Sequence, residues 1–555
     1  MHPLESRLTM FATHKVTNQP PEFDYNLYRT DLALQSAVAA FGGNTQSNEL
    51  TDYGEIAQDN LLNHSALANR NKPQLRNFDR FGNRINEVEF HPSYHKIMTD
   101  AIAAGLPSSP WSEPGPGAHV ERAAKVYMHC QAEQGTTCPT TMTFSSVPAL
   151  QVQPDITSDW LKGVMSREYD PRNLPWQEKN GITIGMAMTE KQGGSDVRAN
   201  QSVAVAATEP GPGKVYLLTG HKWFCSAPMS DGFLVLAQTD AGLGCFLMPR
   251  WTPDGELNSF QIQRLKDKLG NWSNASGEIE FNKAFSYLLG DEGRGINTIL
   301  EMVAMTRFDC MIGSAALMRQ ALAQAMHHCS YRQSFGKPLI EQPAMVSVLA
   351  DLCVESEAAL LLTLRVAQAL DNATDEHSQQ MIRSLTPVGK FWICKRTPAM
   401  VYECMECLGG SGYVEESIMP QLFRESPLNS IWEGCGNIQS LDVLRALSKS
   451  PQTADALLQE LDITQGVDKS LDQLVNSLRV DFKNANFDEG SCRQLSANIA
   501  RAICASLMVR YAPQASAEHY IATRVFSQHG IFGSVSPATD AAASILQRAS
   551  PVQSV

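Results

Sequence analysis

The stretch at residues 429–439 places one carboxylate among apolar side chains and follows it immediately with glycine. It reads NSIWEGCGNIQ, so Glu433 follows Ile431 and Trp432 and precedes Gly434. Burial beside apolar side chains disfavours the charged form of a carboxyl group and raises its pKa, which suits a general base. Glycine lets the backbone come close to a flat ligand and turn sharply. The stretch predicts a catalytic base at Glu433, and a glutamate that caps a helix or faces solvent is the alternative.

Two further segments combine hydroxyl groups with glycine or with an aromatic ring. Residues 188–196 read MTEKQGGSD, and their hydroxyls and successive backbone N–H groups suit a ring edge and a phosphate. A surface turn would use many of the same residues. Residues 220–226 read GHKWFCS and contain the aromatic ring of Phe224 and the hydroxyl of Ser226. An ordinary strand with a buried aromatic residue is the alternative there.

Arginine marks two other segments. Residues 330–339 read SYRQSFGKPL, and the guanidinium fork of Arg332 is well suited to a pyrophosphate. Arg307 could contact a substrate or form a structural ion pair, and both interpretations stay open. Cys404 and Cys407 have zinc-like spacing, but no second cysteine pair or histidine pair stands in register with them, so no metal site is predicted.

Five segments between residues 188 and 439 resemble the signatures of the acyl-CoA dehydrogenase superfamily and follow one another along the chain in the family's order. Those signatures are I/V-Y/W-E-G-T-x-x-I-Q, M-T-E-P-G-A-G-S-D, G-x-K-x-W-I-T, R-x-x-F-G-x-P-L and L-G-G-x-G-Y, the last of which matches residues 408–413. The chain has KQGG at residues 191–194 where the second signature has P-G-A-G. With the stretches at residues 140–144 and 264–271, this departure is similar to the AidB branch, the flavoproteins of the bacterial response to DNA alkylation. The resemblance covers nearly the whole chain.

The resemblance implies FAD as cofactor and an acyl-CoA or another small molecule as substrate. Some family members carry the base immediately before the arginine, but Thr306 stands there, so Glu433 inherits the role of base and Arg307 that of a substrate contact. Arg332 would reach the FAD of a neighbouring subunit in a dimer of dimers. The chain departs from the family pattern at Glu406, where many members have glutamine. The implied FAD contacts are Met188, Thr189, Gly194, Ser195, Phe224, Cys225, Ser226, Arg332, Phe335, Glu406, Gly409, Gly410, Trp432, Gly434, Cys435 and Asn437.

The elements that must position these residues follow from hydrophobic periodicity. The pattern predicts a mainly α protein with a middle β-domain, and the resemblance implies the acyl-CoA dehydrogenase fold with an added helical C-terminal domain. We expect a helical domain over residues 1–180, a small barrel or sandwich over 181–290, a second helical domain over 291–449 and a last one over 450–555. Helices are expected at 120–132, 296–330 and 343–372, and strands at 182–188, 203–205, 215–218, 233–236 and 245–248.

Composition limits which binding partners and which cellular compartment are expected. The net charge of −13 argues against simple coating of DNA, so a DNA contact would need a local patch. No apolar run approaches the about 20 residues of a membrane span. The thirteen cysteines suit free thiols in a reducing compartment, and the first residues lack the pattern of a secretory signal, so the cytoplasm is expected.

The C-terminal section, residues 450–555, is where the AidB branch departs from ordinary acyl-CoA dehydrogenases, and there the branch carries a domain implicated in binding double-stranded DNA. Acidic residues fall early in this section and arginines late, so a basic face is expected at Arg493, Arg501, Arg510 and Arg524. A solvated helix surface is the alternative. The resulting prediction is an FAD-dependent homotetramer of the response to DNA alkylation with weak, isovaleryl-CoA-like dehydrogenase activity. The alternative is a metabolic acyl-CoA dehydrogenase without a DNA role.

Overall fold

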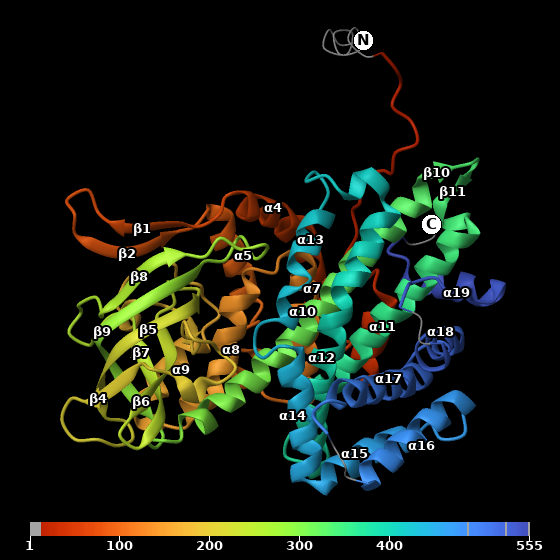
Figure 1. Ribbon diagram of the computed structural model, residues 1–555. Helices are drawn as coiled ribbons and strands as arrows, with labels where there is room; N and C mark the ends of the chain where they lie inside the picture. Colours follow the sequence, from red (N-terminus) through yellow and green to blue (C-terminus); the bar gives the residue numbers. More distant parts are fainter. Residues whose placement is uncertain (1–12, 485–487, 528–529, 553–555) are drawn as a thin grey trace.

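The computed structural model describes residues 13–484, 488–527 and 530–552. Figure 1 shows a β-domain at one side, three long helices (α10, α11 and α12) through the centre and the C-terminal helices packed on the other side. The predicted fold class, mainly α with a middle β-domain, is therefore confirmed. None of the described helices is both long and apolar enough to span a bilayer.

The N-terminal region is helical except for one hairpin that the sequence analysis missed. Strands β1 and β2 pair antiparallel, with Leu75 opposite Val88, and Gly82 in the connecting turn has a left-handed φ of 88°. The predicted helix at residues 120–132 is α7, and it is buried on nearly all sides. The elements are α2 (Leu32–Ala40), α3 (Glu49–Ile56), η1 (Ala57–Leu61), α4 (Leu62–Arg70), β1 (Gln74–Phe78), β2 (Arg84–Glu89), α5 (Pro92–Ala103), α6 (Ser109–Ser112), α7 (Ala118–Ala132), α8 (Thr137–Gln151) and α9 (Pro154–Val164).

The β-domain is a small barrel, as predicted. Its strand order is β3-β6-β4-β5-β9-β7, pairing between β6 and β7 closes the sheet, and β8 adds to β9. The sequence analysis located the first five strands but not the last two. The strands are β3 (Ile184–Ala187), β4 (Val203–Ala206), β5 (Val215–Ser226), β6 (Gly232–Thr239), β7 (Gly242–Pro249), β8 (Phe260–Leu265) and β9 (Ser276–Leu289).

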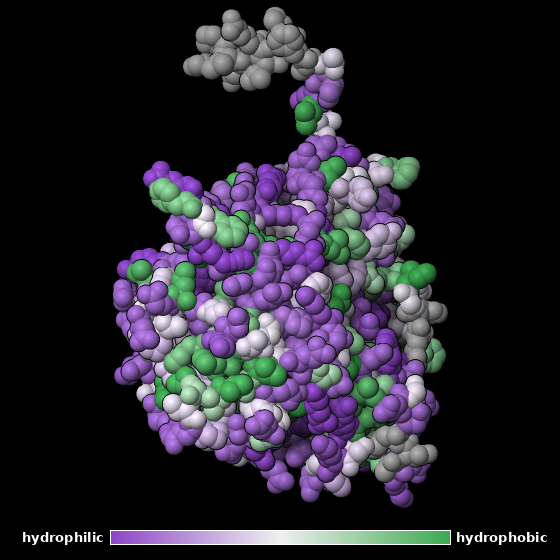
Figure 2. Space-filling model, turned by 60° about the vertical axis from the view of Figure 1, so that its left-hand side comes forward, coloured by the Kyte–Doolittle hydropathy of each residue, from purple (hydrophilic) through white to green (hydrophobic). Residues whose placement is uncertain are grey.

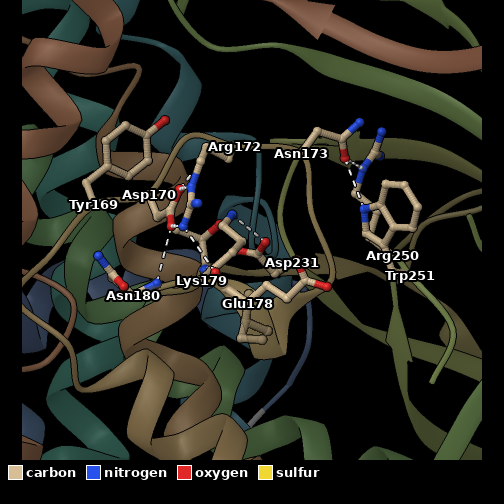
Figure 3. A network of polar contacts seen from close by, with 12 residues as sticks. Tyr169, Asp170, Arg172, Asn173, Glu178, Lys179, Asn180, Asp231, Arg250 and Trp251 are labelled. Carbon is tan, nitrogen blue, oxygen red and sulfur yellow. Dashed lines mark hydrogen bonds and ion pairs between the residues drawn. The ribbon is translucent and has the colours of Figure 1, made fainter. Parts of the chain in front are cut away.

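A polar network fastens the connection between the N-terminal helices and the barrel (Figure 3). Lys179 and Asp231 form an ion pair at 2.5 Å, and both side chains are only 5% exposed. The Asn173 Oδ1 accepts hydrogen bonds from Arg250 Nε at 3.1 Å and from Trp251 Nε1 at 3.2 Å. These contacts join residues 170–180 to the ends of β6 and β7, which fixes the barrel against the helices.

The second helical region begins at Gly295, where the helical period was predicted to return. Helices α10 (Gly295–Tyr331), α11 (Pro343–Asp371) and α12 (Glu376–Cys407) are its long members. The remaining elements are β10 (Gln333–Ser334), β11 (Lys337–Pro338), η4 (Leu339–Glu341), η5 (Gly409–Gly412), α13 (Met419–Glu425), η6 (Leu428–Ser430), α14 (Gly436–Lys449), α15 (Pro451–Asp462), α16 (Lys469–Asn484), α17 (Cys492–Tyr511), α18 (Gln514–Tyr520), η7 (Ile521–Phe526) and α19 (Thr539–Ala549).

The C-terminal helices share a core with the rest of the chain. Leu457 on α15 and Ile503 on α17 belong to the same hydrophobic cluster as Leu360 on α11 and Met311 on α10. Helix α17 packs directly on α11, α12 and α14. The helices on either side of residue 450 are therefore packed into one continuous hydrophobic core.

Candidate functional site

A cavity of about 600 Å³ lies where the barrel, α8, α10 and the segment between α13 and α14 meet. It brings together residues that are far apart in the sequence. The sequence-predicted residues that line it are Met188, Thr189, Gly194, Ser195, Phe224, Ser226, Arg307, Trp432, Glu433, Gly434 and Cys435. The surface turned forward in Figure 2 is mostly hydrophilic and carries an apolar patch. Four apolar lining residues are also solvent exposed and form the rim of the cavity: Phe224, Leu269, Leu300 and Ile431.

The barrel side of the cavity is held by a buried ion pair that the sequence analysis did not identify. Lys222 Nζ lies 2.8 Å from Glu190 Oε1, and neither side chain is exposed. Burial raises the pKa of Glu190, but the hydrogen bonds from Lys222 and from the backbone N–H of Gln201 outweigh burial and lower that pKa to about 2. The pair fastens the 188–196 turn to β5, and the backbone N–H of Trp223 donates to the carbonyl of Thr189 at 2.8 Å.

The barrel wall offers an aromatic ring next to hydroxyl groups. Phe224 is 48% exposed, and Ser226 Oγ lies 3.1 Å from Ser276 Oγ on β9. A Cβ atom on Gly194 would lie 2.5 Å from Thr189 Oγ1, so glycine is required for the turn to close over that hydroxyl. An aromatic face beside hydroxyls and open backbone fits a flat ring with a polar edge, which is the chemistry of an isoalloxazine.

Glu433 lines the same cavity as Thr189, Phe224 and Ser226. Its φ is +58°, a left-handed conformation uncommon for a residue other than glycine, and Gly434 follows with φ +91°. The Thr306 hydroxyl donates to Glu433 Oε2 at 2.7 Å. The predicted apolar enclosure is not formed by Ile431, which is 63% exposed, and Glu433 itself is half-buried. Its carboxylate is therefore positioned by a hydrogen bond and remains accessible from the cavity.

The segment that carries Glu433 is anchored by two cations. Lys390 on α12 is buried and donates to the carbonyls of Asn429 at 3.0 Å, Trp432 at 2.8 Å and Gly434 at 2.8 Å. Arg307 Nε donates to the Glu433 carbonyl at 3.1 Å, and its guanidinium pairs with Asp442 at 2.8 Å. Arg307 thus forms a structural ion pair and also lines the cavity. The sequence offered no signal for Lys390, because its three acceptors are backbone carbonyls.

Two residues predicted to contact the cofactor point elsewhere. The Cys225 side chain is fully buried in the barrel core, because successive residues of β5 face opposite sides of the sheet and Phe224 and Ser226 take the cavity side. Asn437 lies exposed on the first turn of α14, where its Oδ1 accepts a hydrogen bond from Arg493 at 2.8 Å. Neither side chain lines the cavity.

A second group of predicted cofactor residues lies outside the cavity, at the ends of α10 and α12. These ends adjoin, since Cys329 Sγ contacts the carbonyl of Cys407. Phe335, in the turn between β10 and β11, is 98% exposed, and Arg332 donates to the carbonyl of Asn18 at 2.6 Å. The other members are Glu406, Gly409 and Gly410, which are all exposed. Within one chain these residues and Glu433 do not share a cavity.

The expected basic face of the C-terminal section is not formed. Arg501 and Arg524 are each 5% exposed, and Arg524 pairs with Asp351 and Glu355 on α11. Other arginines of the section pair with carboxylates too: Arg510 with Glu460, and Arg548 with Glu357. Only Arg493 among the four predicted DNA contacts is exposed. Spacing along the sequence did not reveal that acidic residues of α11 and α15 would meet these side chains.

Comparison with known families divides the chain into three matching regions. Residues 18–171 match the family described as adaptive response protein AidB N-terminal domain. Residues 185–284 match the acyl-CoA dehydrogenase middle domain, and residues 293–448 match the acyl-CoA dehydrogenase C-terminal domain. All the cavity residues that the sequence analysis selected fall within the last two regions.

Individual proteins agree with these matches. The chain is 43% identical over 525 residues to the Escherichia coli (strain K12) protein named "Putative acyl-CoA dehydrogenase AidB", covering 94% of this chain and 96% of that one. It is 29% identical to acyl-CoA dehydrogenase family member 11 of Caenorhabditis elegans, over 72% of this chain and 66% of that protein. The crystal structure of Caenorhabditis elegans ACDH-11 in complex with C11-CoA matches with a TM-score of 0.82 and 24% identity, covering 98% of this chain and 94% of that one.

Proposed function

The chain belongs to the acyl-CoA dehydrogenase family and, within it, to the AidB group; from that premise we propose an FAD-dependent enzyme that oxidises the Cα–Cβ bond of an acyl-CoA thioester. The observation that carries the proposal is the convergence of Glu433 with Thr189, Phe224 and Ser226 on one cavity. A base on one wall and a ring-binding surface on the other are what removal of a proton and a hydride from neighbouring carbons requires.

The chain's own residues supply the base and its orientation. Glu433 takes the α-proton of the thioester, while the Thr306 hydroxyl holds one carboxylate oxygen and leaves the other free for the substrate. Lys390 and Arg307 keep the segment in place by binding its carbonyls, so the carboxylate can accept the proton without a rearrangement of the backbone. FAD, when bound, accepts the hydride from the β-carbon.

The barrel residues would hold the isoalloxazine end of FAD, and the pyrophosphate end would meet the second group of predicted residues in another subunit. Thr189 offers a hydroxyl and Phe224 an exposed ring to the isoalloxazine, and Ser195 offers a hydroxyl to the pyrophosphate. Arg332 and Phe335 lie outside the cavity of their own chain and on the surface, which suits donation to a neighbour. We therefore propose a homotetramer built as a dimer of dimers.

An anaerobic titration of the FAD-loaded protein with a panel of acyl-CoAs tests this function. The panel should include isovaleryl-CoA and straight chains of increasing length, with flavin absorbance as the readout. Bleaching by at least one acyl-CoA is expected, and isovaleryl-CoA is the probe we favour. A protein that cannot be loaded with FAD, or a loaded protein whose flavin no acyl-CoA reduces, would refute the proposal.

Duplex-DNA binding in the adaptive response to alkylation is the second candidate function. It is supported by the AidB N-terminal family match and by the 43% identity to the Escherichia coli relative. The exposed cations of the C-terminal helices are Lys469, Lys483 and Arg493, and they are the side chains available for phosphate contacts in that section. A cytoplasmic site of action follows from the same proposal.

The DNA proposal is testable by fluorescence anisotropy with a labelled duplex at 50 and 200 mM salt. Replacing Lys469, Lys483 and Arg493 together by alanine should weaken DNA binding and make it less dependent on salt. The variant would form fewer phosphate contacts, so fewer counterions would be released from the DNA on binding. A matched triple variant of exposed cations in the N-terminal hairpin (Arg76, Arg80 and Lys72) serves as the control. Full affinity in the C-terminal variant would show that the C-terminal section is not the DNA site.

A further inference from the structure

Lys268 lines the cavity but has no role so far in the proposed proton removal or flavin binding. It lies on the connection between β8 and β9 and lines the cavity together with Ser226 and Ser276. Its Nζ donates to the carbonyl of Asn274 at 2.6 Å and to Ser276 Oγ at 3.1 Å. Among the described residues no carboxylate lies within ion-pair distance of Lys268, whereas its neighbour Lys266 pairs with Glu278 at 2.6 Å.

An ammonium group donates hydrogen bonds and cannot accept them, so Lys268 sets the direction of the hydroxyl chain. Ser276 Oγ accepts from Lys268, which leaves the Ser276 proton free to donate to Ser226 Oγ at 3.1 Å. The Ser226 proton is then directed toward the cavity, where the neighbouring Cys138 thiol and a bound ligand are its possible acceptors. A positive charge thereby polarises two hydroxyls toward the place where the family's flavin ring is held.

We propose that Lys268 is a positioning residue for the bound flavin: it orients the Ser276 and Ser226 hydroxyls and favours the electron-rich, reduced form of the ring. The inference rests on the proposed FAD site. Its physical basis is that an ammonium without a carboxylate partner in a partly desolvated wall interacts strongly with negative charge that develops nearby.

The charge state of Lys268 supports this role. Burial lowers the pKa of Lys268 to about 8, and the positive charge of Lys72 acts in the same direction. Cys138, Glu425 and Glu133 oppose the decrease, and both glutamates lie beyond ion-pair distance. The ammonium form therefore still predominates at neutral pH. A neutral amine could accept a hydrogen bond from Ser276, which would reverse the chain, so the charged form is the one that directs the Ser226 proton into the cavity.

The test measures the flavin rather than turnover. Lys268→Met is loaded with FAD, and its midpoint potential and sulfite affinity are compared with those of the parent, because sulfite binding to a flavin also places negative charge on the ring. We expect sulfite affinity to fall about tenfold, from loss of one nearby charge. The midpoint potential should fall by about 30 mV, the shift for a tenfold change in a two-electron equilibrium.

Matched variants separate the possible causes. Lys162→Met removes an exposed lysine that pairs with Asp159 on α9, away from the cavity, and should leave both readouts unchanged. Lys268→Arg should restore most of the parent values, and Ser276→Ala, which keeps the charge, should produce a smaller decrease. Lys268→Gln replaces Lys268→Met if the latter does not retain FAD. Unchanged potential and sulfite affinity in the charge-removing variant would overturn the inference, and failure of the parent to bind FAD would overturn the proposed function as well.

Discussion

The cavity and the C-terminal helices use charged side chains in opposite ways. In the cavity, Glu433 is held by a hydroxyl and Lys268 by a carbonyl and a hydroxyl, so both keep their charge available to a ligand. In the C-terminal helices, Arg524 meets two carboxylates and Arg510 pairs with Glu460. Charge that is neutralised within the protein stabilises packing, whereas charge held by neutral donors and acceptors remains able to act on a ligand.

The largest expected effect concerns the cavity. Glu433→Gln keeps the shape of the side chain but cannot accept the α-proton, so reduction of the flavin by a reactive acyl-CoA should slow by about 10²–10⁴-fold. Stopped-flow absorbance of the FAD-loaded variant measures the rate. Bound FAD and the thermal transition should match the parent. A variant that reduces its flavin at the parent rate would place the base on another residue.

The next effect tests the C-terminal side of the comparison. Arg524→Met leaves Asp351 and Glu355 buried with one cation fewer, and removal of one partner from a buried pair typically costs about 3–5 kcal/mol. The variant should unfold at clearly lower denaturant concentration. Arg479→Met is the control, because Arg479 and Asp462 form a pair that is about 40% exposed and should contribute less than about 1 kcal/mol. Equal losses of unfolding free energy in the two variants would show that the buried and the exposed ion pairs contribute alike.

A smaller effect is expected at the residue that orients the base. Thr306→Val removes the hydroxyl that donates to Glu433 while nearly preserving volume, and a hydrogen bond to a charged group contributes about 1.5–3 kcal/mol. Flavin reduction should slow by about tenfold or more, with unchanged FAD affinity. Thr306→Ser should recover most of the rate. If serine and valine behave alike, the hydroxyl does not position the carboxylate.

The smallest effect is expected at Arg493, the exposed member of the predicted DNA group. Its hydrogen bond to Asn437 lies at the surface, so Arg493→Ala should change the free energy of unfolding by no more than about 0.5 kcal/mol. Thermal melts monitored by circular dichroism check this. A loss as large as that of Arg524→Met would show that exposure in this section does not distinguish free from structural arginines.

Most of the cavity could be predicted from the sequence because its parts are local. Neighbouring residues alone reveal the glycines near Thr189 and Glu433. They also reveal the alternation of Phe224, Cys225 and Ser226 along β5. Two features were not recognised although they depend on local alternation. Strand geometry turns the Cys225 side chain inward, so its predicted contact with the cofactor is left to its backbone, and the β1–β2 hairpin was overlooked although Leu75 and Val88 alternate with polar residues.

By itself the sequence determined the fold class and most of the residues that line the cavity, because backbone conformation and side-chain alternation depend on residues a few positions apart. Only the tertiary structure decided what each charge meets. Thr306 reaches Glu433 across 127 positions of the chain, and Glu355 reaches Arg524 across 169. Electrostatic and hydrogen-bond energies depend on distance and burial in space, so the same arginine pattern is compatible with an exposed basic face or with a buried ion-pair network until α11 is packed against it.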